Sequence, residues 1–207
     1  DGSDDAQPAV MLAHGFGGQC QDLDAQARRL AQEGYVVLAW TARGFGQSGG
    51  RIHLNAPAYE VADASALIDL LAERDDVLLD ADGDPRVGIA GGSYGGAIAL
   101  LAAGYDQRVD AIAPRITWND LGASLFPQFA AADDPATAAA FEPIAQPGVF
   151  KRLWAGVFFG SGSASQDDPT ICGRFADDVC DAYSASAATG VPTPEILGGV
   201  AARSIAA

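Results

Sequence analysis

The stretch Gly91-Gly92-Ser93-Tyr94-Gly95-Gly96 decides the fold of this chain. It follows the apolar run Arg86-Val87-Gly88-Ile89-Ala90, which is typical of a buried strand. Small apolar residues from Ala97 to Ala103 come directly after it and predict a helix. We therefore expect a strand, a tight turn and a helix. The glycines on either side of the serine fit this turn, because side chains there would collide where the strand and the helix cross.

Ser93 is the residue that this turn would present to solvent. A Gly-x-Ser-x-Gly turn between a strand and a helix lifts the serine hydroxyl clear of the backbone, as in the nucleophile elbow of the α/β-hydrolases. The alternative is a glycine-rich turn with an incidental serine, since a motif this short recurs by chance. Both flanks favour the elbow, and we interpret Ser93 as a nucleophile.

A second motif follows a second predicted strand. The run from Pro8 to Ala13 has a buried-strand pattern and ends in His14-Gly15-Phe16-Gly17-Gly18. This arrangement resembles the oxyanion loop of the same fold, in which fixed N–H groups stabilise the negative oxygen of a tetrahedral intermediate. The predicted donors are the backbone amides of Phe16 and Tyr94, with Gly17 as the alternative to Phe16.

The chain alternates strand and helix as far as Trp118. Apolar patterns predict a parallel sheet with helices between its strands; the expected strands are 8–13, 35–40, 86–91 and 109–114, and the expected helices 21–32, 58–73 and 94–104. We assign residues 1–118 to an α/β core and residues 119–207 to a helical cap or lid. Four aromatic residues are candidates for an acyl pocket in or next to this cap: Trp118, Phe126, Trp154 and Phe158. The alternative is that they only attach the cap to the sheet.

Composition narrows the function classes. With 207 residues, 49% of them hydrophobic, the chain can bury one core and a small accessory region. Its formal net charge of -15 argues against a nucleic-acid or anionic-membrane partner. The glycine-rich loop 44–50 lacks the ending of a phosphate-binding loop. We expect no cofactor, no metal and no membrane span.

Two cysteines bear on the compartment. Cys172 and Cys180 lie eight residues apart with no histidine nearby, which argues against a zinc site. Two free thiols would suit a cytosolic protein and a disulfide an exported one, and we favour the disulfide. We therefore expect a secreted or extracytoplasmic protein. The chain starts at Asp1 and not at Met, so we expect that an upstream segment has been removed or left out.

The motifs together resemble one family. The segments 14–18, 42–50, 84–96 and 116–120 are similar to those of the Xaa-Pro dipeptidyl-peptidase and cocaine-esterase family of α/β-hydrolases. The resemblance covers essentially the whole chain, although its specific motifs lie before residue 121. It implies hydrolysis of a small ester, amide or peptide through an acyl-Ser93 intermediate. Members of this family often place a tyrosine hydroxyl in the oxyanion loop, where this chain has Phe16.

The general base is missing from the expected position. The triad order in this fold is serine, then Asp or Glu, then His, and no histidine follows Ser93. The chain has only His14, which belongs to the oxyanion loop, and His53. Asp110 and Asp120 are weak candidates for the acid. We expect the triad Asp and His, and the terminal strands of the sheet, to come from the remainder of the same hydrolase outside residues 1–207, so that this chain is inactive alone.

Two alternative functions remain open. The elbow also resembles that of prolyl-oligopeptidase-like serine peptidases. A non-catalytic α/β-hydrolase-like module could bind a ligand or partner through the same cleft. The presence of both an elbow serine and an oxyanion motif favours the enzyme, because a binding module needs neither.

Overall fold

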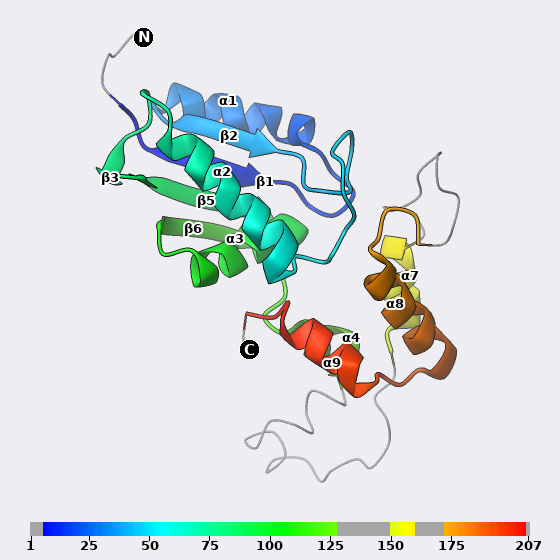
Figure 1. Ribbon diagram of the computed structural model, residues 1–207. Coiled ribbons are helices and arrows are strands. Elements are labelled where there is room, and N and C mark those ends of the chain that lie inside the picture. Colours follow the sequence, from blue (N-terminus) through cyan, green and yellow to red (C-terminus); the bar gives the residue numbers. More distant parts are fainter. Residues whose placement is uncertain (1–5, 128–149, 160–171, 206–207) are drawn as a thin grey trace. The chain divides into compact units, whose positions relative to one another are not determined.

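The computed structural model of the protein describes residues 6–127, 150–159 and 172–205 (Figure 1). It divides into two compact units, Asp1–Thr117 and Trp118–Ala207.

The first unit is built on a four-stranded parallel sheet. The strands are β1 (Ala9–Ala13), β2 (Val36–Trp40), β5 (Val87–Gly92) and β6 (Val109–Arg115), in the spatial order β2-β1-β5-β6. All four lie where the apolar patterns predict them. The register pairs Ala13 at the end of β1 with Gly91 at the end of β5, so the two motif-bearing loops leave the sheet at the same edge.

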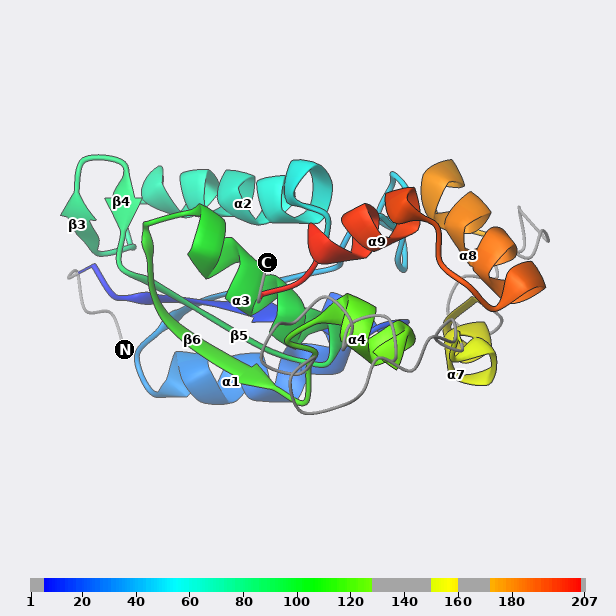
Figure 2. The same ribbon diagram turned by 90° about the horizontal axis from the view of Figure 1, so that it is seen from below.

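Three helices cover the two faces of this sheet. Figure 2 shows α1 (Asp24–Gln32) on one face, with α2 (Ala62–Ala72) and α3 (Tyr94–Tyr105) on the other. α3 packs on β5 and β6 and is buried along most of its length. Its small residues explain this, because they let a helix lie close to the sheet. The centre of the core is formed by side chains that are at most 1% exposed: Met11, Leu12, Ile68, Val87 and Ile89.

The outer edge of β6 is open. Within the described residues, β6 pairs only with β5, and Asp110 to Ala113 are all exposed, including Ile112 at 39%. An apolar strand of a parallel sheet is normally covered on both faces. In the described part of the chain, β6 therefore presents an unpaired edge with exposed side chains.

Two local features differ from the expected pattern. A short hairpin of β3 (Leu79–Ala81) and β4 (Asp84–Pro85) precedes β5 and was not among the expected strands. The helix expected over 58–73 begins with a π-helical turn, Pro57–Val61, before α2. π-helical turns are rare and are frequently found at functional sites. This one carries the buried residue Glu60.

Two glycines allow the strand to turn directly into the helix. A Cβ atom on Gly95 would lie 2.6 Å from the carbonyl carbon of Ala13 and 2.7 Å from the carbonyl oxygen of His14. One on Gly91 would lie 2.8 Å from the Ala13 oxygen. Real Cβ atoms do not approach backbone this closely, so α3 could not stay against β1 with a larger residue at either position.

We predict that Gly95→Ala lowers the free energy of unfolding by about 3 kcal/mol or more, because the rigid backbone of β1 cannot move aside. Gly104→Ala is the matched control on the same helix. A Cβ there would meet nothing within 4 Å, and the gain in helix propensity should stabilise the protein by about 0.5 to 1 kcal/mol. Urea denaturation of the two variants measures both effects. Equal stability of Gly95→Ala and wild type would contradict the packing argument.

The second unit is helical. It contains α4 (Leu121–Leu125), α7 (Arg152–Val157), α8 (Asp177–Thr189) and α9 (Pro194–Ala201). The Asp120 carboxylate caps α4 through the Ala123 N–H at 2.8 Å, and the Thr193 hydroxyl caps α9 through the Ile196 N–H at 3.3 Å. Of the helices in the described ranges, none is long and apolar enough to cross a membrane.

A disulfide joins Cys172 to Cys180 at the start of α8, as the sequence analysis predicts. Cys20 is the free cysteine among the described residues. Closing this short loop restricts the unfolded chain and should stabilise the second unit by about 2 to 3 kcal/mol.

Thiol counting tests this bond. In denaturant without reductant, the protein should react as having one free thiol, Cys20, and after reduction it should react as having three. Three reactive thiols before reduction would contradict the disulfide.

Candidate active site

Ser93 lies at the turn between β5 and α3, with φ 55° and ψ -118°. Such a conformation costs a non-glycine residue about 1 to 3 kcal/mol and persists only when its surroundings hold it. Three backbone hydrogen bonds do so: the Ser93 N–H donates to the Arg115 carbonyl at 2.8 Å, and the Ser93 carbonyl accepts from the Gly96 and Ala97 N–H groups at 3.0 Å each. The turn that the sequence predicts is therefore present and strained.

The loop after β1 lies beside this serine. A Cβ atom placed on Gly15 would be 3.9 Å from the Ser93 Cβ and 3.7 Å from the Gly92 carbonyl oxygen. The Gly18 N–H donates to the Gly15 carbonyl at 3.0 Å and closes the turn that contains Phe16. The structure thus brings together the two segments to which the oxyanion donors were assigned.

Three aromatic rings pack edge to face beside the turn. The ring centroids of Phe16 and Tyr94 lie 5.7 Å apart, and Phe45 lies 5.0 Å from Phe16 and 5.4 Å from Tyr94. Edge-to-face pairs at these separations are favourable. They connect the side chains of the two residues whose backbone amides are the predicted donors.

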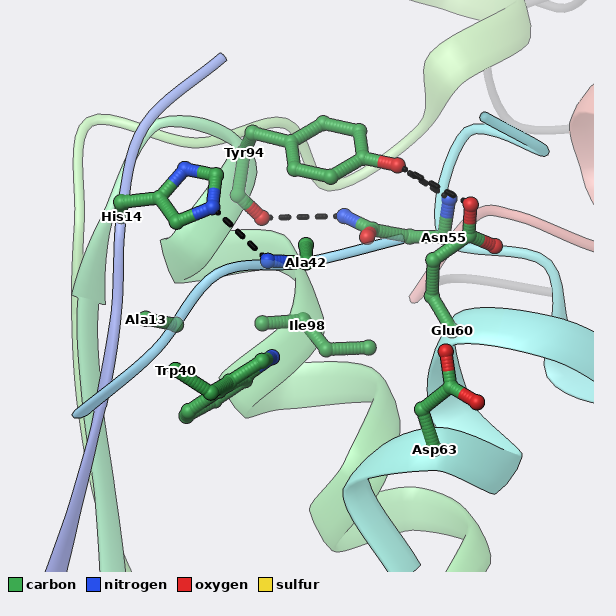
Figure 3. Close-up of a pocket in the computed structure, with 9 residues that line it drawn as sticks. All are labelled: Ala13, His14, Trp40, Ala42, Asn55, Glu60, Asp63, Tyr94 and Ile98. Carbon is green, nitrogen blue, oxygen red and sulfur yellow. Dashed lines mark hydrogen bonds between the residues drawn. The ribbon is translucent and has the colours of Figure 1, made fainter. Parts of the chain in front are cut away.

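His14 has a structural role. It is 4% exposed, its Nδ1 lies 2.7 Å from the Gly15 carbonyl oxygen, and its Nε2 accepts from the Ala42 N–H at 2.9 Å (Figure 3). Nδ1 therefore carries the proton in this arrangement. The Nε2 bond joins the loop after β1 to the loop after β2, and the Nδ1 bond lies within the loop after β1. Burial lowers the pKa of His14 below its usual 6.5, against the opposing effects of the Gly15 hydrogen bond and the Asp22 charge.

The other weak candidates also have structural contacts. The His53 ring stacks on Tyr59 with centroids 3.5 Å apart. Asp110 accepts from the Val87 N–H at 2.8 Å, and Asp120 caps α4. Within the described residues, no hydrogen bond joins the Ser93 hydroxyl to a histidine.

A polar network holds Tyr94, the residue after the serine. The Asn55 side-chain amide donates to the Tyr94 carbonyl at 2.9 Å, and the Asn55 N–H donates to the Tyr94 hydroxyl at 3.1 Å (Figure 3). The same hydroxyl donates to Glu60 Oε1 at 3.3 Å. Tyr94 is therefore held at its backbone and at its side-chain tip from one loop.

Glu60 is a buried carboxyl group, 3% exposed. Besides the Tyr94 hydroxyl, it accepts from the His53 N–H at 2.6 Å and the Ala56 N–H at 3.0 Å. Burial raises the pKa of Glu60, and the bonds from these N–H groups act in the opposite direction. Nearby, Arg43 pairs with Asp63 at 2.5 Å and lies 5.3 Å from the centroid of the Tyr59 ring.

A small pocket lies beneath this network (Figure 3). It is lined by residues of β1, β2, α2, α3 and the loops between them: Ala13, His14, Trp40, Ala42, Asn55, Glu60, Asp63, Tyr94 and Ile98. Among the described residues, no group of three or more His, Cys, Asp or Glu side chains is arranged to hold a metal ion.

The four aromatic candidates for a substrate pocket lie in the second unit. Phe126 is 1% exposed and stacks on Phe150 at 5.1 Å, which places it in that unit's core. Trp118 donates from Nε1 to the Arg203 carbonyl at 2.9 Å. Trp154 is 50% exposed and meets Phe158 edge to face at 4.6 Å. Their role in substrate binding stays a prediction.

The sequence analysis missed Asn55 and Glu60. The available signal was a carboxylate immediately before Val61, on the same apolar pattern as Ala64 and Ile68. A buried carboxylate needs hydrogen-bond partners. Those of Glu60 are Tyr94, which lies 34 residues later in the sequence, and the backbone of the loop that precedes Glu60.

The fold and the elbow are those of an α/β-hydrolase. Residues 4–131 match the family model Hydrolase_4, described as serine aminopeptidase, S33. The match covers more than half of the chain, which therefore belongs to this family of hydrolases.

Two curated relatives illustrate the likeness. An uncharacterized 31.7 kDa protein of Escherichia coli is 31% identical over 114 residues, covering 55% of this chain and 38% of that protein. Quorum-quenching protein AidA of Acinetobacter baumannii is 34% identical over 118 residues, covering 56% and 37%. The chain thus spans less than two fifths of the length of these relatives.

Solved structures share the fold at lower identity. Acetyl xylan esterase from Paenibacillus sp. R4 superposes with a TM-score of 0.50 at 20% identity, covering 70% of this chain and 52% of that one. DcsB, in complex with its substrate analogue, gives a TM-score of 0.52 at 18% identity, covering 95% and 70%.

The pKa of His14 gives a pH prediction. The unfolded chain protonates this histidine near pH 6.5, whereas the folded protein resists protonation. Below pH 6.5 the unfolded state therefore binds more protons, and the free energy of unfolding falls as the pH falls. His14→Gln keeps an acceptor for the Ala42 N–H but cannot be protonated.

We expect wild type to lose more stability than His14→Gln between pH 7.5 and 5.5, by up to about 1.4 kcal/mol per pH unit. Urea denaturation at several pH values measures the difference. Parallel stability curves for the two proteins would contradict a buried neutral His14.

Proposed function

We propose that this chain carries the nucleophile and the oxyanion hole of a serine hydrolase that cleaves an ester or amide bond through an acyl-Ser93 intermediate. The observation that carries the proposal is the strained turn at Ser93, with Gly15 and Phe16 beside it. Strain of this kind is concentrated at active sites, because the fold must supply the energy that holds it. A purely structural turn gains nothing from it.

The residues then take the following roles. The Ser93 hydroxyl attacks the carbonyl carbon of the substrate and transfers its proton to a base. The backbone N–H groups of Phe16 and Tyr94 stabilise the oxyanion that forms on the carbonyl oxygen. Collapse of this tetrahedral species expels the alcohol or amine, which takes the proton, and leaves the acyl-Ser93 ester. Water hydrolyses the ester in a second step of the same kind.

The base and its acid come, in this proposal, from polypeptide outside residues 1–207. His14 uses both ring nitrogens in backbone contacts, and His53 stacks on Tyr59. The open edge of β6 supports a further strand on that side. A loop at the carboxyl end of such a strand would emerge at the same edge of the sheet as Ser93.

For substrates, we propose a small ester, amide or peptide, as the likeness to Xaa-Pro dipeptidyl-peptidases and cocaine esterases implies. The proposed oxyanion donors are backbone N–H groups alone, since Phe16 has no hydroxyl. Of the four aromatic candidates for substrate binding, Trp154 is half-exposed. The disulfide supports an oxidising, extracytoplasmic compartment for the protein.

Replacing the nucleophile tests the proposal. In the full protein, Ser93→Ala should lower kcat/KM for p-nitrophenyl acetate by about a thousandfold or more, because no other group forms the acyl intermediate. Ser184→Ala, which removes an exposed serine from α8, serves as the control and should match wild type. Turnover by Ser93→Ala at the rate of the control would contradict the nucleophile assignment.

A further inference from the structure

Tyr94 is the first residue of α3, and three hydrogen bonds fix it. Asn55 binds its carbonyl oxygen and its hydroxyl, and Glu60 binds the hydroxyl. All the groups involved lie in the first unit and are buried: Asn55 is fully inaccessible, and Glu60 and Tyr94 are each 3% exposed.

We propose that Asn55 and Glu60 are positioning residues that hold the Tyr94 N–H in line with the oxyanion formed at Ser93. This inference rests on the proposed function. The direction of the Tyr94 N–H depends on the peptide that follows Ser93. The Ser93 carbonyl of the same peptide accepts from the Gly96 and Ala97 N–H groups at 3.0 Å each, so the direction of this peptide depends on how firmly the first turn of α3 is held. The hydrogen bonds to the Tyr94 carbonyl and to the Tyr94 hydroxyl restrain this residue at its backbone and at the end of its side chain.

The network carries costs that packing alone does not explain. Burying a carboxyl group is unfavourable, and an apolar pair in its place is often as stable or more stable. Leu54 and Asn55 both adopt left-handed conformations, with φ 57° and 60°. Among the described residues, the Asn55 Oδ1 atom is buried without a hydrogen-bond partner. The groups that carry these energetic costs all belong to the segment that holds Tyr94, the residue after Ser93.

The geometric demand on an oxyanion donor explains why such a restraint matters. The donor must stand about 2.7 to 3.1 Å from the position of the developing negative oxygen, and loss of one donor costs about 100- to 1000-fold in kcat. A donor that is displaced but still present should cost less. We therefore expect a loss of about tenfold when the restraint is released.

The test compares two variants of the full protein. Tyr94→Phe removes the hydroxyl, and Glu60→Gln puts an amide where three donors point. Titration with a fluorophosphonate counts the active sites, so that kcat for p-nitrophenyl acetate is expressed per active site and misfolded protein is not counted. We expect kcat to fall about tenfold in each variant with KM within twofold of wild type, and the rate of fluorophosphonate labelling to fall in parallel.

Two further variants sharpen the comparison. Tyr105→Phe removes an exposed hydroxyl from the other end of α3 and should leave kcat unchanged. Asn55→Gly keeps a residue that tolerates φ 60° and removes only the side-chain grip on the Tyr94 carbonyl. It should also lower kcat about tenfold, and it provides the answer if Glu60→Gln fails to fold.

The outcomes separate the two proposals. If wild type is labelled at Ser93 but Tyr94→Phe and Asn55→Gly retain wild-type kcat per active site, the positioning role is wrong and the proposed function stands. If wild type is not labelled, the proposed function fails and this inference fails with it. A variant that loses only thermal stability, at unchanged kcat, assigns the network to folding alone and also overturns the inference.

Discussion

The strained turn at Ser93 is the constraint on which the rest of this structure depends. A residue with φ 55° holds its position only if both flanking elements are fixed. β5 is fixed by pairing with β1 and β6, and α3 is fixed by the close approach of Gly95 to the backbone of β1. The Arg115 carbonyl, at the end of β6, accepts a hydrogen bond from the Ser93 N–H and connects the turn to this edge strand.

The surrounding side chains extend this support outward. His14 joins the loop after β1, which carries the predicted oxyanion donor Phe16, to the loop after β2. Asn55 and Glu60 hold Tyr94 from the opposite side. The backbone around Ser93 is thus held by β5, by α3 and by the Arg115 carbonyl. Under the proposed mechanism, rigidity is what a site needs when its donors must be in place before the charge develops.

Much of this arrangement could be predicted from the sequence. The four strands and the elbow follow from local patterns, because apolar runs of five or six residues and a glycine on each side of Ser93 are sufficient signals. For Cys172 and Cys180 the sequence allowed either a disulfide or two free thiols, and the disulfide was the favoured interpretation. The hairpin before β5 was missed because its strands have only three and two residues, fewer than a periodic pattern needs.

The Tyr94 network could not have been predicted in the same way. It joins residues that are 34 to 39 positions apart in the sequence. It also depends on left-handed conformations at Leu54 and Asn55, which no local motif predicts. The narrower family resemblance stays a proposal, whereas the α/β-hydrolase fold and the serine aminopeptidase family are established. Local motifs identified the class of site, and tertiary contacts determined how it is held.

The most direct test of the central claim is fluorophosphonate labelling of two samples, the full protein and a chain of residues 1–207, with the modified residue located by peptide mass spectrometry. We expect one adduct on Ser93 in the full protein and none in the shorter chain, because the proposed base lies outside residues 1–207. Equal labelling of Ser93 in both samples would contradict the claim and would require a base within residues 1–207.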